Sequence, residues 1–157
     1  MILDSGSREE FSCGAVRDLQ ESKGRCDLMP LDVCADFLHD PVIRKIYDFQ
    51  QSGKVDDLYD AIGTFGLFCG MDDADLMLEV SVHYAEGCKK YGERNWEKGG
   101  ADGGIPVWSF ISSAVRHYLK WLRHDDDERH DRAFVWNLMG AAWKVKRQQE
   151  REGATGA

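Results

Sequence analysis

Two carboxylates and an imidazole in one helical segment are the side chains best suited to chemistry. At about 100° of rotation per residue, Glu79, His83 and Glu86 fall within about 60° of one another on a helix. Val80 and Tyr84 belong to an apolar stripe beside that face. The polar group therefore borders the buried side of the helix, which predicts a site for a metal ion or a substrate. A solvated helix face is the alternative.

A second group of the same kind occurs near the end of the chain. His130 and Asn137 share a helical face with Asp127, and Asp131 lies about 40° from Asp127. If this helix faces the first one, carboxylates from both would converge on a divalent cation, for which Mg²⁺ or Mn²⁺ suits oxygen ligands best. The alternative is that the acidic run 125–128 only caps the helix and complements its dipole.

The elements that must position these groups are helices. Apolar residues recur at helical spacing, and proline, aspartate and glycine mark the starts and stops. No segment shows the alternation of a strand. The predicted helices span residues 30–38, 41–52, 55–68, about 72–91, 107–122 and about 128–149. We expect an all-α bundle centred on the last three, with a single domain at residues 14–147 and flexible ends at 1–13 and 148–157.

The helix predicted at residues 107–122 is strongly amphipathic. Its apolar side includes Ile111, Val115 and Tyr118. The residues expected on its polar side are Ser109, Ser112, Ser113, Arg116 and Lys120.

Composition limits the possible partners and the compartment. The chain has 157 residues, a formal net charge of −8 and a pI near 5.1, which argues against binding a nucleic acid polymer. No apolar run approaches the roughly 20 residues that a bilayer requires, and the start lacks a signal-peptide pattern. Five cysteines without CxxC spacing indicate reduced thiols. We expect a soluble cytoplasmic protein.

The segment 14–30 carries charges on both sides of Gly24. It is either an extended arm with solvated charges or a loop whose Lys23 and Arg25 reach phosphate groups, because lysine and arginine are the usual phosphate donors. The segment alone leaves both interpretations open.

Four blocks of the sequence resemble the phage-associated dATP/dGTP diphosphohydrolase family, which is similar to the MazG-like, all-α nucleotide pyrophosphohydrolases. The most distinctive block contains Lys90-Tyr-Gly-Glu-Arg-Asn-Trp96. The four blocks are residues 14–30, 83–99, 113–117 and 130–137. The resemblance implies a hydrolase of acid anhydrides that converts a deoxynucleoside triphosphate to the monophosphate and pyrophosphate. It also implies Mg²⁺ or Mn²⁺, a homo-oligomer (dimer or tetramer), and a phage or prophage protein in the host cytoplasm.

The metal ligands differ from the pattern of MazG-like enzymes, which use Glu-Glu-x-x-Glu and Glu-x-x-Asp helices. This chain has neither motif, but its two acidic groups stand where the motifs would lie. The expected metal ligands are Glu79, Glu86, Asp127 and Asp131. Glu86 or His83 would act as the base for the attacking water.

The resemblance also points to residues that would contact the substrate. The expected phosphate ligands are Lys23, Arg25, Lys90, Arg94 and Arg116. Trp96 or Tyr91 would stack on the base, and Asn95 or Asn137 would read its edge. The alternative function is a non-catalytic helical module that binds a nucleotide or another protein. The missing glutamate motif is the feature that favours this alternative.

Overall fold

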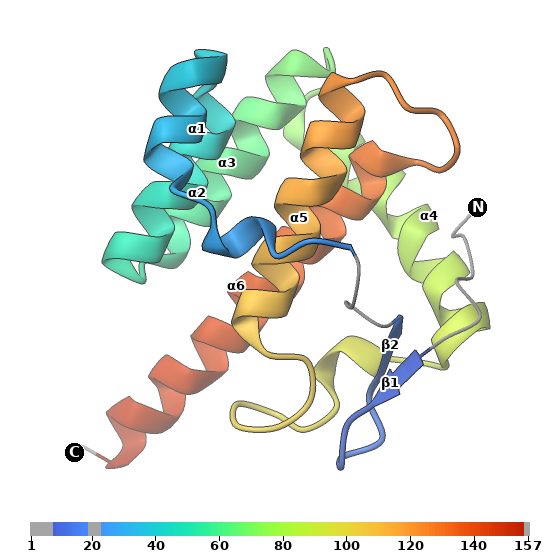
Figure 1. Cartoon of the computed structure of the whole chain (residues 1–157). Helices are drawn as coiled ribbons and strands as arrows, with labels where there is room; N and C mark the ends of the chain where they lie inside the picture. Colours follow the sequence, from blue (N-terminus) through green and yellow to red (C-terminus); the bar gives the residue numbers. More distant parts are fainter. Residues whose placement is uncertain (1–7, 19–22, 156–157) are drawn as a thin grey trace.

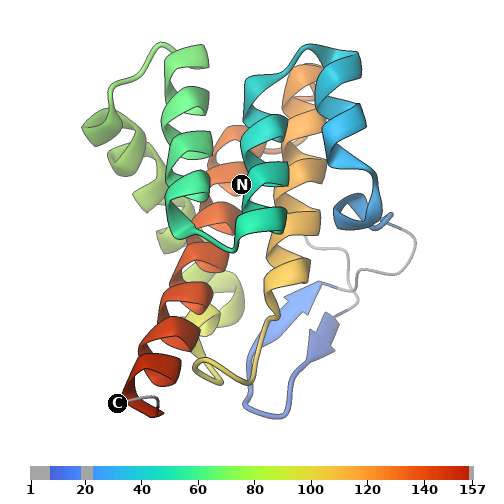
Figure 2. The same cartoon turned by 90° about the vertical axis from the view of Figure 1, so that its left-hand side faces the viewer.

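Two long helices, α5 (Val107–Leu122) and α6 (His130–Thr155), pack along each other at the centre of the fold. The computed structural model describes residues 8–18 and 23–155. The other helices are α1 (Leu31–Leu38), α2 (Pro41–Ser52), α3 (Val55–Phe68) and α4 (Asp73–Tyr91), with short 3₁₀ turns at Cys26–Leu28 and Asn95–Glu97. Figure 1 shows α4 on one side of the central pair and α1 to α3 on the other. From the side, α1 to α3 form a layer in front of α5 and α6 (Figure 2).

The predicted all-α fold and its six helices are confirmed, with one change in extent. The last helix begins at His130 and continues to Thr155, beyond the predicted end near residue 149. Two short strands, described below, were not predicted. Regular structure therefore reaches into both end regions that we expected to be flexible; residues 1–7 and 156–157 lie outside the described part of the chain. No helix of that part is long and apolar enough to span a bilayer.

Side-chain caps mark the starts of two helices, α2 and α4. The Asp40 carboxylate accepts a hydrogen bond from the backbone N–H of Ile43 at 2.8 Å and so caps α2. Asp72 caps α4 in the same way. The hydroxyl group of buried Tyr118 donates to the second oxygen of Asp40, which ties the start of α2 to α5.

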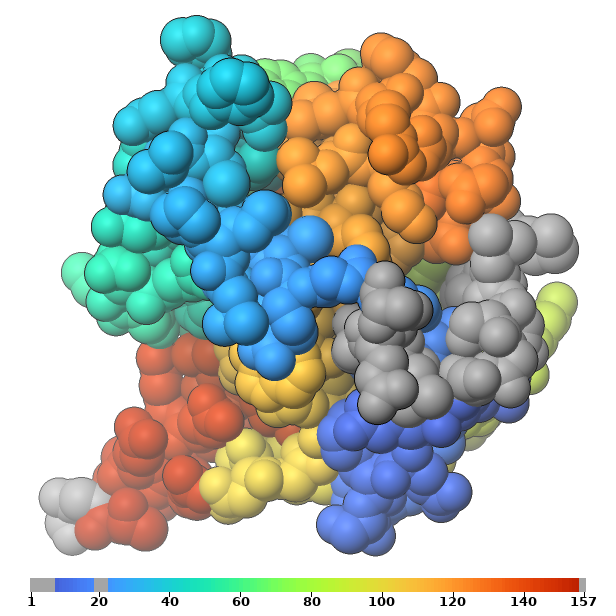
Figure 3. Space-filling view, in the orientation of Figure 1, coloured from blue at the N-terminus to red at the C-terminus, as the bar shows by residue number. Residues whose placement is uncertain are grey.

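The predicted polar side of α5 is covered rather than exposed. Ser109, Ser112 and Ser113 are all buried, because residues 23–28 lie across this side of the helix (Figure 3). The Ser112 hydroxyl accepts a hydrogen bond from the backbone N–H of Cys26 at 3.1 Å. Small hydroxyl side chains allow the chain to approach closely and also satisfy its backbone groups.

Two three-residue strands form an antiparallel hairpin that the sequence did not predict. β1 (Arg8–Glu10) pairs with β2 (Val16–Asp18). The Asn95 side chain accepts a hydrogen bond from the Val16 N–H and donates one to the Val16 C=O, each at 2.8 Å. Asn95 thus pairs with β2 as a neighbouring strand would. Strands this short show no readable alternation, and their partner lies 79 residues away.

The glycine-rich loop before α5 folds against the middle of α6. The ammonium group of Lys144, which is 1% exposed, donates hydrogen bonds to the carbonyl oxygens of Gly100 and Gly103. The loop therefore uses its carbonyl groups to satisfy a buried lysine, which gives its glycines a structural role.

The helices α5 and α6 are tightly packed at Gly140. A Cβ atom at this position would overlap the ring of buried Phe110. We expect Gly140→Ala to lower the free energy of unfolding by about 1–3 kcal/mol, because overpacking outweighs the gain in helix propensity. The measurement is urea unfolding followed by circular dichroism.

Gly63 provides the matched control, because it is also helical and no described heavy atom lies within 4 Å of a Cβ placed there. Gly63→Ala should leave stability unchanged or raise it by up to about 1 kcal/mol. Equal stability of the two variants would contradict the close approach of α5 and α6.

Candidate functional site

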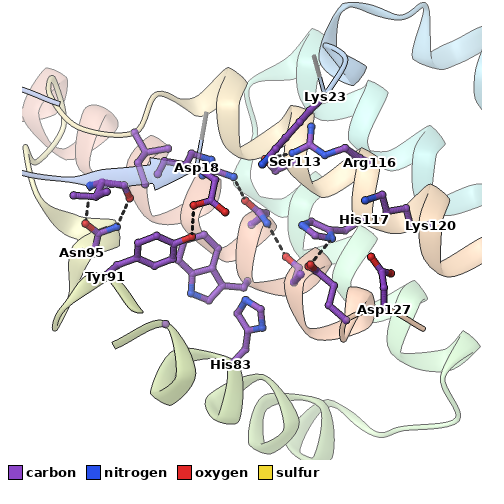
Figure 4. Close-up of a pocket in the computed structure, with 18 residues that line it drawn as sticks. Asp18, Lys23, His83, Tyr91, Asn95, Ser113, Arg116, His117, Lys120 and Asp127 are labelled. Atoms are coloured by element: carbon purple, nitrogen blue, oxygen red, sulfur yellow. Dashed lines mark hydrogen bonds and ion pairs between the residues drawn. The ribbon is translucent and has the colours of Figure 1, made fainter. Parts of the chain in front are cut away.

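A cavity of about 460 Å³ opens between β2, α4, α5 and the first half of α6. Its volume lies within the range typical of small-molecule sites. Figure 4 shows Arg116, His117 and Lys120 of α5 on one side, with Tyr91 and Asn95 on the other and His83 reaching in from α4. The ionisable side chains that line the cavity, apart from Tyr91, are Arg17, Asp18, Lys23, His83, Arg116, His117, Lys120, Asp127 and Glu128.

Four cationic side chains among the described residues line the cavity. Lys23 and Arg116 were predicted phosphate ligands, and both line the cavity together with Arg17 and Lys120. Burial lowers the pKa of Lys23 and of Arg116, and it lowers the pKa of Arg17 to about 10. Burial penalises the charged form, so an anion in the cavity would restore the energy that these groups lose when water leaves.

Arg17 is the most informative of these residues. Its Nη2 donates a hydrogen bond to Oδ1 of Asn137 at 2.6 Å, and its guanidinium carbon lies 5.3 Å from the centre of the Phe110 ring. Its Nη1 is buried and has no hydrogen-bond partner among the described residues. An unsatisfied buried donor costs about 1–3 kcal/mol, and more when it is charged. Because Arg17 also lines the cavity, a ligand bound there is a candidate for the missing acceptor.

Sequence reasoning missed Arg17 as a site residue, although it lies within one of the four family-like blocks. The two predicted asparagines turn out to hold it in place. Asn137 fixes its guanidinium group and donates to the Ala133 carbonyl at 2.8 Å, while Asn95 fixes the strand on which it lies. Both amide groups are thus engaged in positioning.

A second tie joins the hairpin to α4. Lys90 forms an ion pair with Asp18 at 3.0 Å, and the Tyr91 hydroxyl donates to the same carboxylate at 3.2 Å. Lys90 was predicted to bind phosphate, but it is not among the described residues that line the cavity. Its ammonium group neutralises Asp18 instead.

Two histidines and two carboxylates meet where α5 ends and α6 begins. The Nδ1 atoms of His117 and His130 lie 2.9 Å apart, and Nε2 of His130 lies 2.6 Å from Oδ1 of Asp127. Oε1 of Glu128 is 3.5 Å from Nδ1 of His117. Burial lowers the pKa of His117 well below its usual range and raises the pKa of Glu128, while the hydrogen bond to His130 lowers the pKa of Asp127.

These side chains include the closely spaced metal-ligand atoms of the described chain. They fall into two overlapping groups, His117–Glu128–His130 and Asp125–Asp127–His130. Of the predicted metal ligands only Asp127 belongs to either group. The four predicted carboxylates are not brought together as one set among the described residues.

Glu79 and Asp131 are linked by Arg129, which binds both carboxylates. The Glu79 carboxylate accepts hydrogen bonds from Arg132 at 2.6 and 3.1 Å and from Arg129 at 3.4 Å. Arg129 also binds both oxygens of Asp131 at 3.0 and 2.8 Å. Neither carboxylate is among the described residues that line the cavity. A helical face of carboxylates and imidazoles does not reveal the two arginines, Arg129 just before α6 and Arg132 on its first turn.

His83 lines the cavity and is uncharged at neutral pH. Its side chain is buried against Trp136, whose ring centre lies 6.0 Å away, and burial lowers the pKa of His83 to about 4. The charge of Glu86 opposes this shift. Glu86 is not among the described lining residues, so it acts on the cavity through His83 in this structure.

The remaining predicted contacts lie outside the cavity. Arg25 pairs with Asp27 and stacks 3.7 Å above the Trp108 ring. Arg94 pairs with Glu97. Trp96, which was predicted to stack on the base, packs edge-on against Trp143 with ring centres 5.3 Å apart. The aromatic residues that do line the cavity are Tyr91 and Trp136, and sequence reasoning missed the second.

The fold and the site together define a helical domain with a cation-lined cavity of nucleotide size. Residues 61–153 match the family model described as dATP/dGTP diphosphohydrolase, N-terminal. The match covers more than half of the chain, so the chain belongs to this family, as the sequence resemblance indicated. Searches of curated proteins and of solved structures returned no match. The matched segment spans α4, α5 and nearly all of α6, while Arg17 and Lys23 lie before it.

The low pKa of His83 predicts a pH dependence of stability. Unfolded histidine titrates near 6.5, whereas folded His83 titrates near 4. Between these pH values the unfolded state binds more protons than the folded state. The contribution of uncharged His83 to the free energy of unfolding is therefore complete above about pH 6.5 and is lost as the pH falls. We expect this contribution to fall by about 2–3 kcal/mol between pH 7 and pH 4.5.

The measurement is urea unfolding of wild type and His83→Gln at both pH values. The variant should lose less stability on acidification than wild type by that amount. His124→Asn is the control, because His124 is exposed and its φ of 65° suits asparagine; it should show the wild-type loss. If His83→Gln loses as much stability on acidification as wild type does, His83 is not held uncharged.

Proposed function

We propose that the cavity binds a deoxynucleoside triphosphate and that the protein hydrolyses it to the monophosphate and pyrophosphate. The observation that carries the proposal is Arg17, a buried cation whose Nη1 has no hydrogen-bond partner among the described residues, in a cavity with three more cations. Membership of a family named for dATP/dGTP diphosphohydrolases supports the same substrate class.

Different cations of the cavity can bind different phosphate groups of a triphosphate. Arg17 offers its open Nη1, and Arg116 and Lys120 project from successive turns of α5 on the same side of the cavity (Figure 4). Lys23 lies next to Arg116. Fixed donors of this kind stabilise the negative charge that develops when pyrophosphate leaves. In the proposed pose the phosphates lie along α5.

The opposite side of the cavity suits the base. Tyr91 and Trp136 present aromatic surface there, and aromatic rings stack on nucleobases irrespective of sequence. Asn95 and Asn137 already use their amide groups to hold Val16 and Arg17. We therefore propose positioning roles for these two asparagines rather than contacts to the base edge.

The resemblance implies Mg²⁺ or Mn²⁺, and the cavity contains suitable donors. Glu128 lines it on the side where the phosphates would lie, and the neighbouring carboxylate of Asp127 adds negative charge there. One or two carboxylates together with phosphate oxygens are the usual ligands of a nucleotide-bound Mg²⁺. A bound ion would polarise the phosphoryl group and acidify a nearby water. Glu79 and Asp131 are engaged by arginines, and we leave them out of the proposed ligand set.

The attacking water is assigned to the α4 side of the cavity. The imidazole of His83 is uncharged at neutral pH, so it can accept a hydrogen bond from a water molecule and orient it. Glu86 lies one turn further along α4, and its negative charge stabilises the imidazolium form that proton transfer would produce. The water adds to the α-phosphorus, its proton passes to this pair, and the bond from the α-phosphorus to the bridging oxygen breaks.

We also propose that the protein forms a dimer or a tetramer. Exposed apolar side chains on α3 and α4, such as Leu67 at 76% and Leu78 at 69% exposure, support self-association. Light scattering after size-exclusion chromatography measures the mass directly.

The test is release of pyrophosphate from each of the four dNTPs with Mg²⁺ or Mn²⁺. Arg17→Gln should lower kcat/KM by at least about tenfold, because a hydrogen bond to a charged group contributes roughly 1.5–3 kcal/mol. Arg151→Gln, at the far end of α6, should retain the wild-type value.

The alternative function is a nucleotide-binding module without catalysis, which the pairing of Glu79 with arginines favours. Thermal stabilisation by a dNTP with no pyrophosphate from any of the four would contradict hydrolysis and support this module.

A second variant tests the assigned base. Glu86→Gln should lower kcat by about 10²-fold or more with little change in KM, as expected for a group that acts in proton transfer. Glu93→Gln, an exposed carboxylate beyond the end of α4, should keep the wild-type kcat. Full activity of Glu86→Gln would remove Glu86 from the mechanism.

A further inference from the structure

We propose that His117, Glu128 and His130 form a metal site that selects a transition ion, such as Mn²⁺ or Co²⁺, over Mg²⁺. The family resemblance suggested a site made of carboxylates, whereas the ligand atoms that the fold brings together include two imidazole nitrogens. A role of this site in hydrolysis rests on the proposed function. Metal binding itself can be measured without any nucleotide.

The distances between the three ligand atoms suit a single ion. The Nδ1 atoms of His117 and His130 are 2.9 Å apart, and Oε1 of Glu128 is 3.5 Å from the first and 4.0 Å from the second. Nitrogen and oxygen ligands lie about 2.0–2.2 Å from such ions, so adjacent ligands are separated by roughly 3 Å in octahedral and about 3.4 Å in tetrahedral geometry. For octahedral geometry the two edges to Glu128 must shorten, and the glutamate side chain has the rotatable bonds to do so.

Asp127 prepares His130 to act as a ligand. Oδ1 of Asp127 lies 2.6 Å from Nε2 of His130, and an ionised carboxylate can only accept a hydrogen bond. Nε2 therefore carries a proton, and in the tautomer that binds a metal the lone pair of Nδ1 faces His117. A carboxylate that holds the far nitrogen of a ligating histidine is the usual second layer of a metal site. This contact is independent of the spacing of the three ligand atoms.

The surroundings favour a bound cation that is open to the cavity on one side. The side chain of His130 is 1% exposed, and those of His117 and Glu128 are 16% and 14% exposed. His117 and Glu128 also line the cavity, so an ion between them would face a phosphate group. Glu128 and Asp127 together balance the charge of a divalent ion.

Nitrogen ligands determine which ion the site prefers. Mg²⁺ takes oxygen ligands and keeps its waters, whereas imidazole suits transition ions, whose affinities rise from Mn²⁺ through Co²⁺. A set of two histidines and one carboxylate is typical of such ions. The overlapping group with Asp125 is the weaker candidate, because Arg123 binds both oxygens of Asp125 and Asp127 already occupies Nε2 of His130.

The experiment is a titration of the purified, chelator-treated full chain with Mn²⁺, in which the free ion is counted by electron paramagnetic resonance. We expect one tight site per chain and an affinity for Mn²⁺ at least about tenfold higher than for Mg²⁺, measured by competition. Co²⁺ should give visible absorption bands with nitrogen ligation. An affinity for Mn²⁺ no higher than for Mg²⁺ would overturn the proposal.

Variants show whether these residues are the ligands. His117→Gln and Glu128→Gln should each weaken Mn²⁺ binding at least about tenfold, and Asp127→Asn should weaken it by about 10–100-fold. His124→Asn, an exposed histidine near the cluster, should bind as wild type does. Circular dichroism confirms that each variant is folded, and wild-type binding by folded His117→Gln and Glu128→Gln would overturn the site.

One more variant separates this site from the carboxylate site that the sequence predicts. Glu79→Gln should keep the wild-type affinity for Mn²⁺, and a loss of binding there would contradict the assignment. The two proposals also fail separately. A chain that binds Mn²⁺ as expected but releases no pyrophosphate overturns the hydrolase, whereas one that hydrolyses dNTPs with Mg²⁺ and shows no preference for Mn²⁺ overturns only the metal site.

Discussion

The burial of the Arg17 guanidinium group beside α6 is the interaction on which the site depends. Burying a charged group is costly unless partners replace the lost water, and Arg17 has a partner on Nη2 but none on Nη1 among the described residues. Long-range contacts keep it there: Asn95 fixes strand β2, the Asp18–Lys90 ion pair ties the same strand to α4, and Asn137 fixes the side chain. In the proposed function, an anion that enters the cavity would recover this cost. Strand β2 and the helices line this cavity together.

The helices could be predicted from the sequence because their signals are local. Asp40 and Asp72 cap their helices within three residues, and the apolar periodicity is present in each segment by itself. The hairpin could not be predicted, since its strands are three residues long and depend on Asn95 far along the chain. The burial of Ser112 on α5 could not be predicted for the same reason, because its hydroxyl accepts a hydrogen bond from Cys26, which is distant in sequence.

The candidate site was predicted in part. Helical geometry singled out His83, and the family-like blocks pointed to Lys23, Arg116 and Asn137; all four line the cavity. The same geometry grouped Glu79 with the metal ligands, because a helical face shows which residues share a side but not which cations face them. In the structure, Glu79 forms ion pairs with Arg129 and Arg132. The contact of His117 with His130 depends on how α5 and α6 pack, which no single-helix pattern contains.

We propose that one cavity joins an anion-binding group, Arg17 on β2, to a metal cluster where α5 ends and α6 begins. A crystal structure of the protein with Mn²⁺ and a non-hydrolysable dATP or dGTP analogue tests this proposal most directly. We expect a phosphate oxygen within hydrogen-bond distance of Nη1 of Arg17, and Mn²⁺ bound to Nδ1 of His117, Nδ1 of His130 and Oε1 of Glu128. A nucleotide bound elsewhere, or a metal ion held by Glu79 and Asp131, would contradict it.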